Sequence, residues 1–273
     1  MLPPDDDVDD RLSAEPYRHG FHAGNHGDVW KHTALLAVLA GFRGAVSVVD
    51  THAGSGRYVL PSQGEWLRGW DRVRALGPTS PAVDRYLSRA RRLGGDDGYP
   101  GSPVLVLDAL GRNGRLLAHE VDDEAFRALR AAVASDARAT LVRRSGWEAV
   151  LPAGPLLVLC DPPYASKPEW SEAAELVVRT ATARPDAAIL LWYPVKRLAR
   201  PNVLHQRLRE AGLRFVAVEL GVAPLDPPPD AMVASGVLLV NPPGQALTEI
   251  HGAIPGLAQA LAEGRWWSRT VAG

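Results

Sequence analysis

Seven short runs of apolar residues recur along the chain, and segments with the apolar spacing of a helix separate most of them. Strands inside a parallel sheet are near-continuous apolar runs, and the helices that connect them cover both faces. The alternation therefore predicts an α/β fold with a mostly parallel, seven-stranded sheet. The expected strands are residues 45–50, 115–120, 140–143, 155–160, 187–193, 214–220 and 236–241. The clearest helical segments are 123–134, 169–182 and 196–211.

Two intervals depart from this alternation. The last two strands are joined by a proline-rich loop, PLDPPPD (224–230), and not by a helix, which predicts that the last strand is antiparallel to its neighbour. More than sixty residues separate Asp50 from the second strand, where a βαβ unit needs about thirty in total. This excess predicts a small helical insertion at about 57–98, with helices at 65–76 and 80–93.

Composition limits the class of protein. At 273 residues and 46% hydrophobic content, the chain can bury a large core, in one α/β domain or in two smaller ones. A single cysteine, Cys160, excludes an intramolecular disulfide, and no stretch reaches the roughly 18 uncharged apolar residues of a membrane span. The acidic start MLPPDDDVDD is unlike a signal peptide, so we expect a cytoplasmic protein. We expect residues 1–16 to form a disordered acidic tail and residues 17–273 to form the folded domain.

The net charge of −1 at first argues against a nucleic-acid partner. Five of the 31 acidic residues lie in the first ten positions, however, and the remainder carries 30 basic against 26 acidic groups. The basic residues concentrate in two runs, RYLSRARR (85–92) and KRLAR (196–200). Guanidinium groups bind phosphate well, so these runs are typical either of a nucleic-acid surface or of a solvated helix face.

A glycine loop, DTHAGSGRY, follows the first strand. Gly54 and Gly56 allow the backbone to approach a ligand closely, as in nucleotide-binding loops, although a tight turn gives the same pattern. The loop lacks the Gly-Lys-Ser/Thr ending of a nucleotide triphosphatase. Glu120 ends the second strand, where an acid can bind the hydroxyls of a ribose, or where it can simply favour the start of a helix. Asp122 or Asp123 suits the N-cap of that helix.

The fourth strand ends in the quartet DPPY, residues 161–164. Two prolines form a rigid extended turn, which fixes the directions of Asp161 and Tyr164. The exocyclic amine of adenine or cytosine is a poor nucleophile, and a carboxylate together with the carbonyl of Pro162 can accept its two hydrogen bonds. Tyr164 offers a face for stacking a flipped base. The quartet therefore predicts catalysis at such an amine; a proline-rich turn without function is the alternative.

Four of the eight histidines fall in YRHGFHAGNHGDVWKH, at His19, His22, His26 and His32. Spacings of three and four would suit a metal if one helix carried all of them. Gly20 and Gly24 interrupt an early helix, however, and Asn25 is typical of an N-cap. A helix from about His26 to Ala40 would leave His19 and His22 on a loop, so we expect no metal site.

Together, these motifs resemble the RlmJ family of class I S-adenosylmethionine-dependent methyltransferases, which methylates N6 of one adenine in 23S ribosomal RNA. The resemblance extends in order from about residue 17 to residue 243. Its segments are YRHGFHAGNHGDVWKH (17–32), DTHAGSGRY (50–58), YPGSP (99–103), DPPY (161–164), LWYP (191–194) and MVASGVLLVNPP (232–243).

The resemblance implies a Rossmann-like class I methyltransferase fold, S-adenosylmethionine as cofactor and 23S ribosomal RNA, free or in an assembly intermediate, as partner, with no obligate protein partner. Asp161, Pro162 and Tyr164 would be catalytic. The implied cofactor contacts are His32, His52, Ser102, Glu120, Ser145, Gly146 and Asp161, and the implied RNA contacts are Tyr17 and Lys31. Ser102 followed by Pro103 also fits an N-cap and first helical position, aimed at the cofactor's carboxylate.

One departure and several alternatives remain at this point. The family commonly has Asp-Gly where this chain has Ser145–Gly146, and serine is a weaker acceptor for the cofactor's adenine. Methylation of adenine in DNA is an alternative, because DPPY serves both polymers. A nicotinamide-dependent oxidoreductase would use the glycine loop but not the quartet, and a nucleic-acid-binding module without catalysis would need neither.

Overall fold

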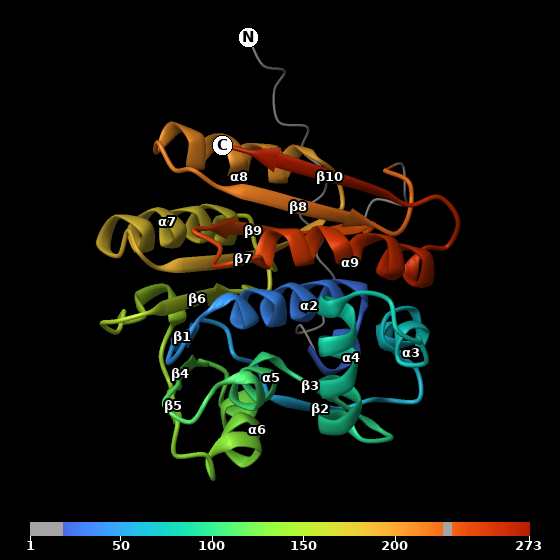
Figure 1. Ribbon diagram of the computed structural model, residues 1–273, viewed down its shortest axis with the longest axis horizontal. Coiled ribbons are helices and arrows are strands. Elements are labelled where there is room, and N and C mark those ends of the chain that lie inside the picture. The colour runs from blue at the N-terminus through green and yellow to red at the C-terminus, as the bar shows by residue number, and fades with distance from the viewer. Residues whose placement is uncertain (1–18, 226–230) are drawn as a thin grey trace.

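One large sheet covered by helices on both faces forms the body of the protein (Figure 1). The computed structural model describes residues 19–225 and 231–273, so the predicted acidic tail and Tyr17 lie outside the described residues. The large sheet has eight strands in the order β10-β8-β9-β7-β6-β1-β4-β5. Its strands are β1 (Ser47–Asp50), β4 (Arg115–His119), β5 (Ala139–Val142), β6 (Leu156–Cys160), β7 (Ala188–Val195), β8 (Val216–Gly221), β9 (Ala234–Val240) and β10 (Trp267–Ala272).

All seven predicted strands are present, and the central five, from β5 to β7, are parallel to one another. The last of the seven predicted strands was expected to be antiparallel to its neighbour. This is confirmed, because β9 lies between β7 and β8 and is antiparallel to both. The prediction of seven strands was wrong by one. β10 adds an edge strand beside β8, and its alternate side chains are exposed, so it lacks the continuous apolar run by which the others were recognised.

The helices form two layers around this sheet. α2, α5 and α9 pack together over one face, whereas α7 and α8 pack on the other. Buried side chains of β6 alternate accordingly: Leu157 and Leu159 join the core beneath α2, and Cys160 joins the core beneath α7. The helices are α1 (His19–His22), α2 (His26–Gly41), α3 (Trp70–Val73), α4 (Pro81–Gly94), α5 (Ser102–Ala109), α6 (Asp123–Val133), α7 (Pro168–Ala183), α8 (Ala199–Glu210) and α9 (Ala246–Leu261), with short 3-10 helices η1 (Glu65–Arg68) and η2 (Gly146–Glu148).

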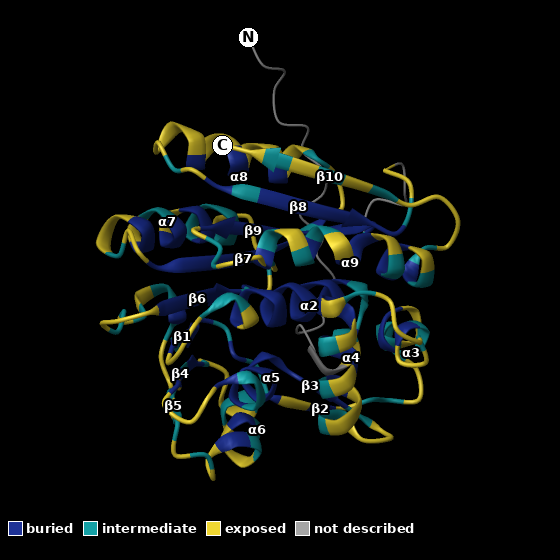
Figure 2. Cartoon of the chain, in the orientation of Figure 1, coloured by how far each residue is buried: buried dark blue, intermediate teal, exposed yellow. Residues whose placement is uncertain are grey.

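Helix α2 is buried along almost its whole length (Figure 2). Its start follows the prediction: Asn25 is the N-cap, and its Oδ1 accepts from the backbone N–H of Asp28 at 2.9 Å. The loop predicted for His19 and His22 was wrong, because these residues form the single helical turn α1. Since α2 lies between the sheet and neighbouring helices, every polar group on it must find a partner inside the protein.

The segment predicted as an insertion begins and ends in a small antiparallel sheet, in which β2 (Arg57–Val59) pairs with β3 (Gly98–Pro100). Between these strands lie η1, α3 and α4. Helix α4 corresponds to the helix predicted at 80–93 and packs against α2 and α9. The pairing of β2 with β3 brings the two ends of the segment together, so the intervening helices lie beside the carboxyl edge of the large sheet.

Candidate functional site

Three adjacent strands bring the predicted site residues into one row. The register of β4, β1 and β6 aligns Asp50, the last residue of β1, with the positions two residues before Glu120 on one side and two residues before Asp161 on the other. His52 is also two residues beyond Asp50. Because neighbouring strands are about 4.8 Å apart, Glu120, His52 and Asp161 emerge side by side at the carboxyl edge of the sheet.

The glycine loop closes against Glu120. The backbone N–H of Gly54 donates to Glu120 Oε2 at 2.8 Å, and Glu120 Oε1 accepts from two further backbone N–H groups after β4. Gly54 has a φ of +59°, and a Cβ there would lie 2.3 Å from the hydroxyl of Tyr58. The loop thus requires glycine at this position and holds the Glu120 carboxylate in a fixed direction. Asp122 is the N-cap of α6, as predicted.

Asp50 is a site residue to which the sequence analysis gave no role. Its side chain is fully buried and accepts a hydrogen bond from the hydroxyl of Ser102 at 2.7 Å. Burial raises the pKa of Asp50 to about 7, and the nearby charge of Asp161 adds to this effect, although the bond from Ser102 opposes it. The predicted N-cap role of Ser102 was wrong. Gly101 is the N-cap of α5, and the Ser102 hydroxyl contacts Asp50 instead. The position of Asp50 at a strand end, like that of Glu120, was the available signal.

Ser145 and Gly146 follow β5, and Gly146 packs closely against Thr51 at the end of β1. A Cβ on Gly146 would lie 1.8 Å from the carbonyl oxygen of Thr51, so the two backbones approach as closely as glycine alone allows. Ser145 caps η2, and the Trp147 ring meets His52 edge-on, with 4.5 Å between ring centroids. Burial lowers the pKa of His52 to about 4, which leaves the imidazole neutral at pH 7.

The DPPY turn lies on the other side of β1. Tyr164 has a φ of +51°, which is strained for a bulky residue and costs about 1–3 kcal/mol. Its hydroxyl donates to the carbonyl oxygen of Trp192 at 2.8 Å, and its ring lies 4.5 Å from that of Trp170. Pro162 is buried beneath the turn. These contacts hold the aromatic ring next to Asp161, and strain of this kind is typical of a functional turn.

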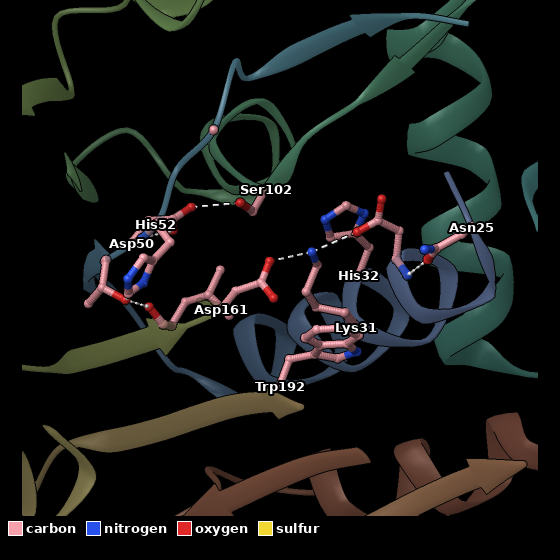
Figure 3. A network of polar contacts seen from close by, with 12 residues as sticks. Asn25, Lys31, His32, Asp50, His52, Ser102, Asp161 and Trp192 are labelled. Atoms are coloured by element: carbon pink, nitrogen blue, oxygen red, sulfur yellow. Dashed lines mark hydrogen bonds and ion pairs between the residues drawn. The ribbon is translucent and has the colours of Figure 1, made fainter. Parts of the chain in front are cut away.

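Lys31 extends from α2 to Asp161 (Figure 3). Its ammonium donates to Asp161 Oδ2 and, at 2.7 Å, to Asp28 Oδ1, and it lies 5.6 Å from the centroid of the Trp192 ring. Burial opposes the charge on Lys31, but attraction and hydrogen bonds from Asp161 and Asp28 outweigh it and raise the pKa of Lys31 above its ordinary value. Lys31, which was expected to contact RNA, therefore contacts Asp161, the expected catalytic carboxylate.

Asp28 is a second residue that the sequence analysis missed. Besides the ammonium of Lys31, its carboxylate accepts the backbone N–H of Gly24 at 2.8 Å. The signal was its spacing of three residues from Lys31 on a helix, which brings two side chains together.

His32 links the site to the inserted helices. It is 2% exposed, and its Nδ1 lies 2.9 Å from the hydroxyl of Tyr99, which lies 3.0 Å from the hydroxyl of Tyr86 on α4. The imidazole also stacks on the Tyr99 ring at 5.6 Å between centroids. The chain of contacts fixes α2, and hence Lys31, relative to α4.

The other histidines of this stretch have different partners. His22 contacts Glu65 at 3.1 Å, and His26 Nε2 lies 3.0 Å from the carbonyl oxygen of Met232. In residues 19–225 and 231–273, no three His, Cys, Asp or Glu side chains are arranged to hold a metal ion. Within the same ranges, no helix is both long and apolar enough to span a membrane.

The strand order and the row of residues define a class of protein. A mostly parallel sheet in this order with the antiparallel strand β9 between β7 and β8, a glycine loop after β1 and an acid after the adjacent β4 constitute the class I methyltransferase fold. The predicted fold class is confirmed, apart from the additional strand β10. A family model described as "Ribosomal RNA large subunit methyltransferase D, RlmJ" matches residues 44–271. The chain belongs to this family.

Individual relatives agree with this assignment. Ribosomal RNA large subunit methyltransferase J of Escherichia coli K12 is 29% identical over 262 residues, with 90% of this chain and 93% of that protein covered. The protein of the same name from Haemophilus influenzae is 30% identical over 273 residues, with 93% and 97% covered. A crystal structure of protein LPL1258 from Legionella pneumophila has a TM-score of 0.84 and 25% identity, and covers 92% of this chain and 98% of that chain.

Proposed function

We propose that this protein is a cytoplasmic enzyme that transfers a methyl group from S-adenosylmethionine to the exocyclic N6 amine of one adenine in 23S ribosomal RNA. One observation carries the proposal. Asp161 lies in the same row as Glu120 and the glycine loop, beside Tyr164, and a buried ammonium holds it in place. The proposal also rests on membership of the family and on the names of its relatives, which act on ribosomal RNA of the large subunit.

The residues of the sheet edge fit the cofactor. Gly54 and Gly146 allow their loops to pack closely against Tyr58 and Thr51 at this edge, and the fixed carboxylate of Glu120 suits the two hydroxyls of a ribose. His52 and Ser145 complete the adenosine end, and His32 and Ser102 the methionine end, in our assignment. When bound, S-adenosylmethionine supplies an electrophilic methyl group.

Asp161, Pro162 and Tyr164 act on the target base. The carboxylate of Asp161 and the carbonyl of Pro162 accept hydrogen bonds from the N6 amine, which favours localisation of its lone pair. The Tyr164 ring stacks on the flipped adenine, a contact of about 1–3 kcal/mol. Because its hydroxyl is held by the Trp192 carbonyl, little conformational freedom is lost when the base arrives.

Lys31 positions the catalytic carboxylate. Its ammonium donates to Asp161 and Asp28 at once, so it both orients Asp161 and favours its ionised form. This assignment replaces the direct RNA contact suggested by the resemblance. Tyr17 remains our candidate for contact with the RNA.

The test is methyl transfer by the purified protein from labelled S-adenosylmethionine, with deproteinised large-subunit ribosomal RNA and duplex DNA in parallel. We expect label in RNA, recovered as N6-methyladenine at one position, and loss of turnover in Asp161→Asn with binding of S-adenosylhomocysteine retained. Label in DNA alone would contradict the proposal. Stabilisation by nicotinamide dinucleotides, with none by S-adenosylhomocysteine, would favour an oxidoreductase instead.

A further inference from the structure

The two basic runs of the sequence differ in how their charges are used. In the first run, the charged groups are occupied within the protein. Arg85 pairs with Glu249 at 2.6 Å, and Arg89 and Arg92 both pair with Asp108. Arg91 donates to two backbone carbonyl groups. This run therefore ties α4 to its surroundings, and two carboxylates neutralise half of its four charges.

The second run has no such partners. Lys196, Arg197 and Arg200 are exposed, and none of them takes part in an ion pair or a side-chain hydrogen bond within residues 19–225 and 231–273. Helix α8, which begins at Ala199, has no acidic residue in its first turn. Lys167, just before α7, is likewise exposed. We refer to Lys167, Lys196, Arg197 and Arg200 as the basic patch.

The register of the sheet locates this patch relative to the catalytic carboxylate. β6 and β7 are parallel with Cys160 opposite Leu191, so Asp161 is level with Trp192. Lys196 is four residues further along the chain, or about 13 Å beyond that level in an extended strand. Helices α7 and α8 begin at this same sheet edge and pack against each other. The patch thus lies at the same edge of the sheet as Asp161.

Lys196 also acts electrostatically on α1. The pKa of His22 is raised, mainly by its hydrogen bond to Glu65, and the charge of Lys196 is among the effects that lower it. Lys196 is therefore close enough to α1 to act on it electrostatically.

We propose that the basic patch binds the phosphate backbone of the RNA that flanks the target adenine. The inference rests on the proposed function and specifies which surface holds the substrate. A flipped nucleotide stays attached to its neighbours, so their phosphates must lie near Asp161, at the sheet edge where unneutralised cations attract them. The charges do not serve helix stability, because cations at the start of a helix are unfavourable to it.

The experiment compares wild type with a Lys196→Ala, Arg197→Ala, Arg200→Ala variant. Deproteinised large-subunit ribosomal RNA is the probe, and its dissociation constant, KM and kcat are measured between 50 and 200 mM KCl. We expect the dissociation constant and KM to rise on the order of 10- to 100-fold, with a shallower salt dependence, because each lost phosphate contact lowers the slope by about 0.7 for single strands. The kcat at saturating RNA and the affinity for S-adenosylhomocysteine should stay within about twofold.

The control removes three charges at the opposite sheet edge, with Arg43→Ala, Arg112→Ala and Arg115→Ala. All three residues are exposed: Arg43 precedes β1, Arg112 precedes β4, and Arg115 is the first residue of β4. Equal RNA affinity and salt slope in wild type and patch variant would overturn the inference, as would equal losses in patch and control variants. If the triple variant does not fold, Lys167→Ala with Lys196→Ala provides the same comparison. Absence of RNA methylation by the wild type would instead refute the proposed function.

Discussion

Replacing Lys31 by methionine removes the cation between two carboxylates while preserving most of the side-chain volume. The side chains of Asp28 and Asp161 are 8% and 11% exposed, so water replaces the lost ammonium poorly. Breaking a buried pair in this way costs about 3–5 kcal/mol. We expect the lower value, about 3 kcal/mol, because Asp161 lies at the sheet edge. For a domain of this size, Tm should fall by about 6–12 °C.

In Lys31→Met, the rate of methyl transfer should fall by more than the loss of folded protein explains. A displacement of the Asp161 carboxylate by about 1 Å should lower the rate of methyl transfer on the order of 100-fold. Without the cation, Asp161 also protonates more readily, so the acid limb of the pH–rate profile should move to higher pH. Thermal unfolding and methyl transfer from pH 5 to 9 measure both effects.

Two comparisons identify the cause. Asp28→Asn combined with Lys31→Met removes one of the two stranded charges, so it should recover part of the Tm but not the activity. Arg112→Met makes the same change in charge at an exposed site on the opposite edge and should alter neither quantity. Full turnover and a Tm within about 2 °C of wild type in Lys31→Met would refute the reasoning.

Three further predictions concern the row of site residues. Because burial raises the pKa of Asp50 from 3.8 to about 7, folding favours its protonated form, and stability should fall as pH rises from about 4 to 7. Asp50→Asn should remove this dependence, so its unfolding free energy should gain up to about 4 kcal/mol relative to wild type between pH 4 and pH 8. Denaturant titrations test this, and a difference independent of pH would contradict it. Tyr164→Phe should keep base stacking and KM but cost about 1–2 kcal/mol of stability through the lost bond to Trp192, whereas Tyr164→Ala should raise KM for RNA on the order of 10-fold or more; equal KM values for the two would exclude stacking. Gly146→Ala should weaken binding of S-adenosylhomocysteine, measured by calorimetry, because its Cβ would overlap the carbonyl oxygen of Thr51; unchanged affinity would show that the loop can move aside.

The positions of the strands along the chain could be predicted because they depend on local pattern. Buried parallel strands need continuous apolar runs, and all seven such runs form strands. β10 escaped prediction because an edge strand is covered on one side only, and its alternating residues resemble a loop. The start of α2 was predictable for the same reason, since a cap involves residues three apart in sequence.

Residues of the site were predictable where their position in a motif fixed their position in space. Glu120 and Asp161 both follow a strand of the parallel sheet, so register alone brings them together. Ser102 was misjudged as a cap because the competing partner, Asp50, is distant in sequence. The partnership of Lys31 with Asp161 spans 130 positions, and no local pattern reports it.

The sequence by itself determined the α/β fold, the edge of the sheet at which the chemistry lies and the quartet that meets the amine, because strand periodicity and strand-end motifs are local properties. Only the tertiary structure decided which charges are neutralised by other residues of the protein and which are exposed at the surface. Lys31 and three arginines of α4 pair with carboxylates, while Lys196, Arg197 and Arg200 remain at the surface. The physical reason is that a charge is neutralised by whatever folds against it, and that neighbour is set by packing between segments far apart in the chain.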